Sequence, residues 1–182
     1  MKLTLKNVRL SFPKLFRPDD KFGGGPKYGA SFIIDPESDE GMANLKGLEG
    51  IVRELEARHL GDKEMPEDRL PIKDGDIKGY PGWEGMRIVT ANSRRPPVIH
   101  DRALREIAEG DAQEPYAGCY VDAVLDLYAI DPQSDYGPRI CAALGGVRFR
   151  SKGKPFGKRL VDAENDYSAI ADDNEADDVP EI

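Results

Sequence analysis

Alternating apolar and polar side chains, repeated over several segments, restrict this chain to a fold rich in strands. The longest alternation is "YVDAVLDLYA", residues 120–129. One face carries Val121, Ala123, Leu125, Leu127 and Ala129, and the other carries Tyr120, Asp122, Val124, Asp126 and Tyr128. Successive side chains of a strand point to opposite sides. This segment is therefore predicted to line a core with one face and to meet solvent, at least partly, with the other.

The same period marks further strands. In "KLTLKNVRLSF" the phase shifts at Lys6-Asn7, which predicts a β-bulge of the kind that bends strongly curved sheets. The apolar face of this strand is Leu3, Leu5, Val8, Leu10 and Phe12. A Pro- and Gly-rich connection, "PKLFRPDDKFGGGP", is expected to follow. The other predicted strands are "KYGASFIID", "WEGMRIVTANS", "PPVIHD" and "GPRICAALGGVRFRS".

One segment has helical periodicity. "ESDEGMANLKGLEGIVRELEARHLG" repeats its apolar side chains every three or four residues, with acids at the start and basic residues in the last turn. This predicts the main helix from about Ser38 to Leu60. A short helix is expected in "DRALREIAEGD", and the polar connection "GDKEMPEDRLPIKDGDIKGYPG" is expected to hold nothing longer than a turn.

Five or six curved strands with one main helix, and no βαβ alternation, favour a mainly β fold, an OB-type barrel rather than a sandwich. Residues 1–160 are enough chain for one domain. Neither a membrane span nor a signal peptide is apparent, so we expect a cytoplasmic protein. Cys119 and Cys141 form no disulfide framework, in keeping with a reducing compartment.

The end of the chain differs in charge. Residues 161–182, from Val161 to Ile182, hold nine acids and no Lys or Arg. The whole chain has 26 basic and 34 acidic residues, so residues 1–160 have 26 basic and 25 acidic ones and a net charge of +1. So polar a segment is expected to be a disordered tail. Such tails often bind partners, although a solubility tail is the alternative.

No pattern of a catalytic or metal site is present. The two histidines and two cysteines stand singly, without the spacing of paired zinc ligands, and we expect no metal and no cofactor. His100 and Asp101 are adjacent, but no nucleophile accompanies them, and an exposed turn explains them better. We expect no enzymatic activity.

Basic residues point to a polyanion as the ligand. Seven of them, and no acid, lie between Tyr136 and Val161. In "VRFRSKGKPFGK" the arginines share one face of the strand, opposite the apolar residues. The expected basic groove consists of Lys27, Arg94, Arg95, Arg139, Arg148, Arg150, Lys152 and Lys154. The alternative is a solvated strand end in a highly charged chain.

Aromatic residues accompany these charges. Proteins hold single-stranded nucleic acid by stacking bases on aromatic rings, each stack contributing roughly 1–3 kcal/mol. The candidates in or beside predicted strands are Tyr28, Tyr80, Trp83, Tyr120 and Tyr128, among which Trp83 is the strongest. Core packing is the alternative role for any single ring.

Several of these segments in order carry a family resemblance. "LSFPKLFRPD", "KYGASFIID", "GYPGWEGMRIVTANSRRPPVIH", "PYAGCYVDAVLDLYAID" and "AALGGVRF" resemble the phage single-stranded DNA-binding proteins once catalogued as a family of unknown function. The resemblance covers about Met1 to Gly157. It implies an OB fold, sequence-tolerant binding of single-stranded DNA, and a role in phage replication and recombination within the infected host cell.

The last residues carry a second resemblance. "DDVPEI" is similar to the acidic tip of bacterial single-stranded DNA-binding proteins, but Glu181 and Ile182 replace the final aromatic residue that follows the proline there. The resemblance implies that the tail binds replication or recombination proteins through Asp172, Asp173, Asp177, Asp178 and Ile182. With a root-mean-square reach of roughly 25 Å, the tail is also expected to compete with DNA for the basic groove.

The predicted function is therefore sequence-independent binding and protection of single-stranded DNA. A non-catalytic adaptor, whose tail recruits proteins and whose barrel binds a protein or a sugar, is the alternative. The sequence leaves open whether the chain forms a homodimer.

Overall fold

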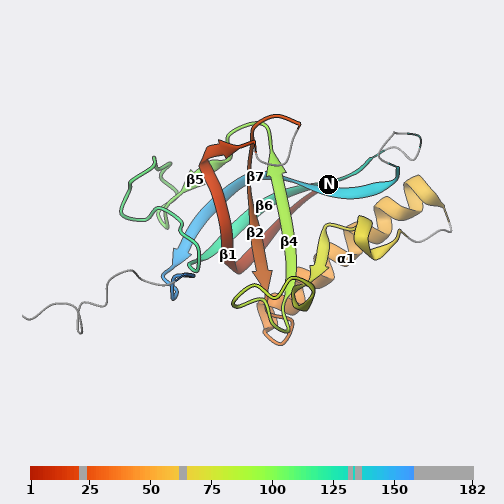
Figure 1. Cartoon of the computed structure of the whole chain (residues 1–182), viewed down its shortest axis with the longest axis horizontal. Helices are drawn as coiled ribbons and strands as arrows, with labels where there is room; N and C mark the ends of the chain where they lie inside the picture. Colours follow the sequence, from red (N-terminus) through yellow and green to blue (C-terminus); the bar gives the residue numbers. More distant parts are fainter. Residues whose placement is uncertain (21–23, 62–64, 131–132, 134–136, 158–182) are drawn as a thin grey trace, which may run out of the picture.

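The computed structural model describes residues 1–20, 24–61, 65–130, 133 and 137–157. Seven strands form one sheet in the order β3-β4-β2-β1-β6-β7-β5. They are β1 (Lys2–Asp19), β2 (Lys27–Ile34), β3 (Ile72–Asp74), β4 (Arg87–Ser93), β5 (Val98–His100), β6 (Tyr120–Ile130) and β7 (Arg139–Ser151). β4 also pairs with β7, so β1, β2, β4, β6 and β7 close into a barrel (Figure 1). The predicted mainly β, OB-like barrel with one main helix is confirmed.

The core fills the inside of this barrel. On β6, Val121, Leu125 and Leu127 are fully buried, whereas Asp126 and Tyr128 on the opposite face are exposed, as the alternation predicted. Asp122 is an exception, because it lies on the outer face and is nonetheless buried. Ion pairs to neighbouring arginines, described below, account for its burial.

The predicted bulge in β1 is present. The register between β1 and β6 shifts between Leu5 and Val8, and Asn7 has a φ of 52°. The Asn7 N–H donates to Asp122 Oδ1 at 2.9 Å. Asn44 of the helix holds Lys6 on both sides: the Lys6 N–H donates to Asn44 Oδ1 at 2.9 Å, and Asn44 Nδ2 donates to the Lys6 carbonyl at 2.8 Å.

β1 does not end where the sequence predicted. Instead of a connection from Pro13, the strand continues to Asp19, with register shifts on both sides of Lys14 and a buried Leu15. The prediction that Phe12 faces the core was also wrong, because its side chain is 51% exposed. The backbone at Phe12 has a φ of 48°, and Pro13 has no N–H for the ladder, so the phase shifts again at this point.

The main helix, α1 (Asp39–Leu60), lies along one side of the barrel (Figure 1). Ser38 Oγ accepts the Gly41 N–H at 3.0 Å and caps its first turn. Leu48, Val52 and Leu55 join the barrel core. The connection that follows holds two three-residue 3₁₀ turns, η1 (Glu67–Arg69) and η2 (Gly75–Ile77), around the short β3. Within the described residues, no helix is long and apolar enough to cross a membrane.

The short helix expected after His100 does not form. Asp101 is only 1% exposed, and its Oδ1 accepts the N–H groups of Ala103 and Arg105 at 2.8 and 2.9 Å. Its Oδ2 accepts Arg105 Nε at 2.7 Å. A side chain that takes up local N–H groups in this way competes with helix formation. The expected exposed turn is therefore a turn organised around a buried carboxylate.

Candidate nucleic-acid interface

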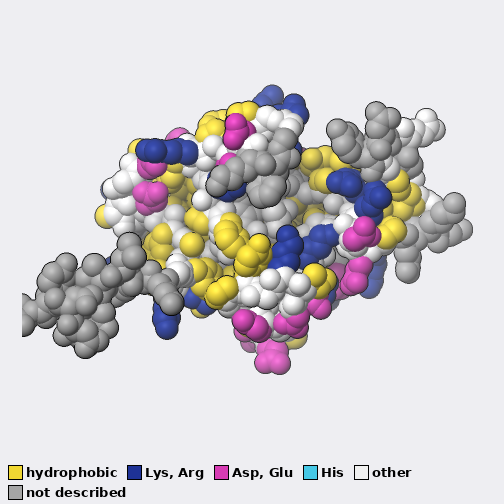
Figure 2. Space-filling view, viewed as in Figure 1, with side chains coloured by type: hydrophobic (Ala, Val, Ile, Leu, Met, Phe, Trp, Pro, Cys, Tyr) yellow, Lys and Arg dark blue, Asp and Glu magenta, His cyan; other side chains and the backbone are white. Residues whose placement is uncertain are grey.

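A groove crosses the outer face of β1, β2 and β4 and encloses a cavity of about 420 Å³. We call it the aromatic groove. Its principal lining residues are Phe12, Lys14, Lys27, Gly29, Ser31, Lys78, Tyr80, Trp83, Thr90 and Asn92. Figure 2 shows yellow apolar side chains beside dark blue basic ones on this face of the molecule, over β2 and β4.

The floor of the groove consists of small polar residues. Ser31 on β2 lies opposite Thr90 on β4, and their hydroxyl oxygens are 3.0 Å apart. One row further along, Gly29 lies opposite Asn92. A Cβ on Gly29 would lie 2.4 Å from Asn92 Oδ1 and 2.8 Å from the Ala91 carbonyl, so a larger residue does not fit. Hydroxyl and amide groups both donate and accept hydrogen bonds.

Three aromatic rings form one wall. Phe12 and Tyr80 are 51% and 39% exposed, and their ring centroids are 4.9 Å apart in an edge-to-face arrangement. The ring of Trp83 lies 4.8 Å from that of Tyr80, and Trp83 is only 5% exposed. Its indole N–H donates to Ser11 Oγ at 3.4 Å. The ring surfaces open to a ligand therefore belong mainly to Phe12 and Tyr80.

Trp83 anchors the loop that carries Tyr80. It packs with Ile33 and Ile88 in a small cluster separate from the main core. The loop begins at Gly75, where a Cβ on this residue would lie only 2.0 Å from the Trp83 carbonyl oxygen. The Gly75 N–H donates to the Met86 carbonyl at 2.9 Å. These contacts hold the loop against the sheet and set the position of Tyr80.

The backbone of Phe12 is strained. A φ of 48° is uncommon for any residue except glycine, and strain of this kind persists at sites where the surrounding structure holds it for function. Here it turns a large apolar ring outward, toward Tyr80. Sequence analysis missed Phe12 because strand alternation placed it inward; the adjacent Pro13 was the available signal for a second break in phase.

Charges on the rim are mainly positive. Lys14, Lys27 and Lys78 line the groove together with one carboxylate, Asp19, which forms an ion pair with Lys14. An adjoining cavity of about 380 Å³ shares Lys78, Trp83, Thr90 and Asn92 with the aromatic groove. No pattern in the sequence singled out Lys78 as a ligand contact.

The structure brings together several of the predicted site residues. Lys27, Tyr80 and Trp83 line the aromatic groove, and Arg139 lines the adjoining cavity. Arg94 lies close by, because its Nη2 donates to the Gly24 carbonyl at 3.4 Å. Three more predicted site residues line neither cavity. They are the exposed Arg95, the half-buried Tyr28, which lies opposite Ser93, and Tyr128, which lies opposite Cys141.

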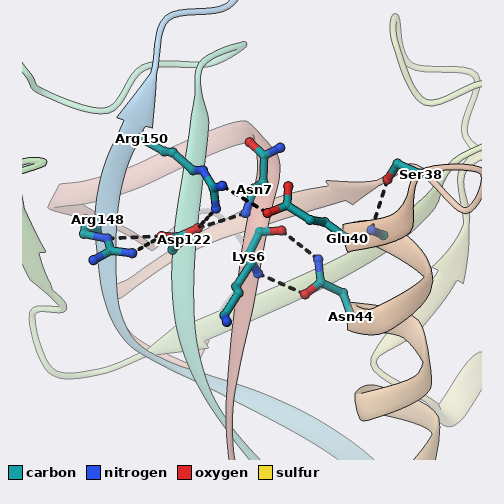
Figure 3. A network of polar contacts seen from close by, with 9 residues as sticks. Lys6, Asn7, Ser38, Glu40, Asn44, Asp122, Arg148 and Arg150 are labelled. Atoms are coloured by element: carbon teal, nitrogen blue, oxygen red, sulfur yellow. Dashed lines mark hydrogen bonds and ion pairs between the residues drawn. The ribbon is translucent and has the colours of Figure 1, made fainter.

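Arg148 and Arg150 lie elsewhere, in what we call the Asp122 cluster (Figure 3). Arg148 Nε and Arg150 Nη1 each donate to the Asp122 carboxylate at 3.1 Å. Arg150 Nη2 also donates to Glu40 Oε1 of α1 at 3.0 Å. The predicted row of arginines on one face exists, but its guanidinium groups are paired with carboxylates rather than left for a ligand.

These pairs determine the ionisation of Asp122. Burial raises the pKa of its carboxyl, but the hydrogen bonds from Arg148, from the Asn7 N–H and from Arg150 outweigh burial. The pKa of Asp122 therefore lies below its ordinary value, and the carboxylate stays charged at neutral pH.

Other predicted residues lie at the same end of β7 as this cluster. Tyr120 pairs with Ser151, and Lys152 and Lys154 are exposed just beyond the strand. Arg148 follows Arg139 by nine residues, which is roughly 30 Å of extended chain at about 3.3 Å per residue. The predicted basic groove therefore divides into two separate regions.

Some predictions fall outside the described residues. The domain boundary at residue 160, and the tail residues Asp172, Asp173, Asp177, Asp178 and Ile182, all lie there. Among the residues that the structure does describe, no group of three or more His, Cys, Asp or Glu side chains is placed to hold a metal ion, and Cys119 and Cys141 are free thiols.

A closed five-stranded barrel with one main helix places this protein in the class of OB-like barrels, a fold that includes binders of oligonucleotides and oligosaccharides. Comparison with known proteins narrows this class. The chain belongs to the family described as Enterobacter phage Enc34, ssDNA-binding protein, whose model matches residues 1–179. The family resemblance seen in the sequence is thereby confirmed.

Three individual proteins are similar to this chain. The chain is 32% identical over 167 residues to putative protein p50 of Acyrthosiphon pisum secondary endosymbiont phage 1, covering 86% of each chain. The single-stranded DNA-binding protein from bacteriophage Enc34 in complex with ssDNA has a TM-score of 0.75 and 30% identity, over 86% of this chain and 89% of that one. The single-stranded DNA-binding protein gp2.5 of bacteriophage T7, at 12% identity and a TM-score of 0.58 over 93% of this chain and 99% of that one, shares the fold.

Proposed function

We propose that this protein binds and protects single-stranded DNA without sequence preference, in the cytoplasm of a phage-infected cell. The observation that carries the proposal is the exposed Phe12 and Tyr80 pair beside the lysines of the aromatic groove. Every base has a π face, so stacking tolerates any sequence. Membership of a family described as phage ssDNA-binding proteins supports the same conclusion.

In this mechanism the lysines neutralise phosphates while the rings hold bases. Lys27 and Lys78 release counterions from the strand, which makes binding depend on salt, whereas Lys14 is already paired with Asp19. Bases stack on Phe12 and Tyr80, and the polar floor of Ser31, Thr90 and Asn92 meets base edges with groups that both donate and accept. No cofactor and no covalent step enters the mechanism.

Tyr80→Ala tests this proposal. Loss of one base stack should weaken binding of oligo-dT by roughly 1–3 kcal/mol, which is about five- to 150-fold. Fluorescence anisotropy at fixed salt measures the change. Tyr80→Phe keeps the ring and should bind nearly as well as the wild type. Met42→Ala removes another exposed apolar side chain, 51% exposed on α1, and should have no effect. Unchanged affinity in Tyr80→Ala would remove the aromatic wall from the mechanism.

We also propose that the acidic tail competes with DNA for the groove and recruits proteins of phage replication or recombination. The support is electrostatic: residues 161–182 carry nine acids and no basic residue, while the charged residues of the groove they would reach are three lysines and one carboxylate. DNA that occupies the groove would release the tail for a protein partner. The tail would then report that the site is filled.

Truncation after Leu160 tests the competition. It changes the net charge from −8 to +1 and should raise affinity for oligo-dT, most strongly at low ionic strength. The gain should shrink toward about 0.5 M salt, because the screening length falls well below the ~8 Å of physiological salt. A full-length control, with the nine tail acids replaced by Asn and Gln, separates charge from length. Equal affinities of the wild-type and truncated proteins at low salt would leave the tail only a recruiting or solubilising role.

A further inference from the structure

The barrel closes at a narrow seam between β4 and β7. These strands run parallel and pair at a single position, Asn92 with Ala143, whereas the neighbouring β6 and β7 pair along most of their length. The cavity of about 380 Å³ lies at this seam, between Thr90 and Asn92 of β4 and the first residues of β7. It adjoins the aromatic groove, because Lys78, Trp83, Thr90 and Asn92 line both cavities.

Basic side chains surround the seam cavity. Lys73, Lys78, Arg69 and Arg139 line it, together with the carboxylates of Asp68 and Asp74. Arg69 forms an ion pair with Asp68 at 3.7 Å, and Lys73 Nζ donates to the Asp68 carbonyl at 2.6 Å. Among the described residues, no carboxylate forms an ion pair with Lys78 or Arg139.

Arg139 has an unmet hydrogen bond. Its Nε is buried and is the one buried side-chain nitrogen or oxygen, within the described ranges, that lacks a hydrogen-bond partner. A buried donor left without an acceptor is destabilising, and more so when the group is charged. Such a group calls for an acceptor from outside the protein, which a water molecule or a ligand can supply.

Lys73, which also lines the seam cavity, has a pKa below its ordinary value. Burial lowers its pKa, and the nearby Arg139 and Lys78 lower it further, against the opposing effects of Asp68 and Glu67. The lining of the cavity holds four cations, Lys73, Lys78, Arg69 and Arg139, against the two carboxylates of Asp68 and Asp74. A bound anion would relieve that crowding.

We propose that the β4–β7 seam holds a backbone phosphate of the bound strand, with Arg139 donating to it and Lys73 and Lys78 beside it. Phosphate supplies several acceptor oxygens, and the planar guanidinium group matches them well. This inference rests on the proposed binding of single-stranded DNA and defines the path of the strand. The strand crosses from β1 over β2 and β4 to the start of β7, and it does not run along the Asp122 cluster.

Arg139→Gln and Lys152→Gln are a matched pair for the test, since each removes one positive charge from β7 or just beyond it. With an oligo-dT of about 12 nucleotides, within the usual range of site sizes, Arg139→Gln should weaken binding roughly tenfold or more. Its plot of log affinity against log salt should be shallower by about 0.7. Lys152→Gln should match the wild type in both respects. Thermal melting confirms that both variants are folded.

Uncharged oligonucleotides give a second readout. On oligo-dT with methylphosphonate linkages, the wild type and Arg139→Gln should bind equally weakly, because the phosphate charge is absent. Wild-type affinity and salt slope in Arg139→Gln, or equal losses in both variants, would overturn the seam proposal while Tyr80-dependent binding remained. Failure of the wild type to bind oligo-dT at all would instead overturn the proposed function.

Discussion

Trp83→Ala is expected to lower the free energy of unfolding by about 3–5 kcal/mol, the usual cost of truncating a buried aromatic residue. Trp83 is 5% exposed and packs with Ile33 and Ile88 on the outside of the barrel. Its removal leaves a cavity under Tyr80 and loosens the loop. Affinity for oligo-dT should fall as well, because Tyr80 loses the ring 4.8 Å away that holds it in place.

Urea unfolding and oligo-dT binding measure these two effects on the same samples. Trp83→Phe is the control: it keeps a ring against Ile33 and Ile88 but loses the hydrogen bond to Ser11, so it should retain most of the stability and affinity. Reduced affinity in Trp83→Ala with wild-type stability would show that the indole itself stacks on a base. The loop would then have to move to expose it.

Asp122→Ala should cost about 3 kcal/mol of unfolding free energy, as removal of one partner from a buried ion pair does. The carboxylate is 5% exposed and accepts from two guanidinium groups and from the Asn7 N–H at the bulge of β1. Arg148 and Arg150 are partly exposed, which keeps the cost near the low end of the range. The bulge loses one of the two residues that hold it.

Glu40→Gln is the control for this substitution. Its carboxylate also pairs with Arg150 but is 40% exposed, so its loss should cost less than about 1 kcal/mol. A similar cost for the two substitutions would show that the buried position of Asp122 contributes nothing. Binding of oligo-dT should be unchanged in both variants when they are folded, since neither residue lines the aromatic groove.

The pH dependence of stability provides a further readout of Asp122. Its pKa in the folded protein lies below the value of 3.8 for a free carboxyl. The stabilisation is therefore present above pH ~4 and is lost as the pH falls through the folded-state pKa. Asp122→Asn should show a shallower loss of unfolding free energy below pH ~4 than the wild type. An unchanged slope would assign acid sensitivity to other groups, such as Asp101, whose pKa is lowered chiefly by the Arg105 N–H.

Local sequence pattern was sufficient to predict the main helix, the barrel and most of its strands, but not β3 or the continuation of β1 to Asp19. The two-residue period on β6, the shift at Lys6-Asn7 and the capped helix after Ser38 all follow from backbone geometry within a few residues. Patterns of this kind depend only on which face of a strand or helix meets the core. Such predictions therefore do not depend on how distant parts of the chain pack.

The site was only partly predictable, because its residues meet through long-range register. Tyr80 and Lys27 were identified, but the composition of the groove depends on how β1, β2 and β4 align. In the sequence, Arg148 and Arg150 cannot be distinguished from basic residues that are free to bind a ligand. Only their pairing across the sheet with Asp122, 26 and 28 residues away, shows that they are occupied.

Phe12 and Trp83 show most clearly which features the sequence pattern predicts and which depend on the tertiary structure. Alternation indicated that Phe12 faces inward, and Trp83 was the strongest candidate for stacking on a base. In the tertiary structure a positive φ beside Pro13 turns Phe12 outward, and the loop folds Trp83 onto Ile33 and Ile88, where it is only 5% exposed. Periodicity records the direction of a side chain relative to its own strand, whereas exposure depends on what the remainder of the chain places over it.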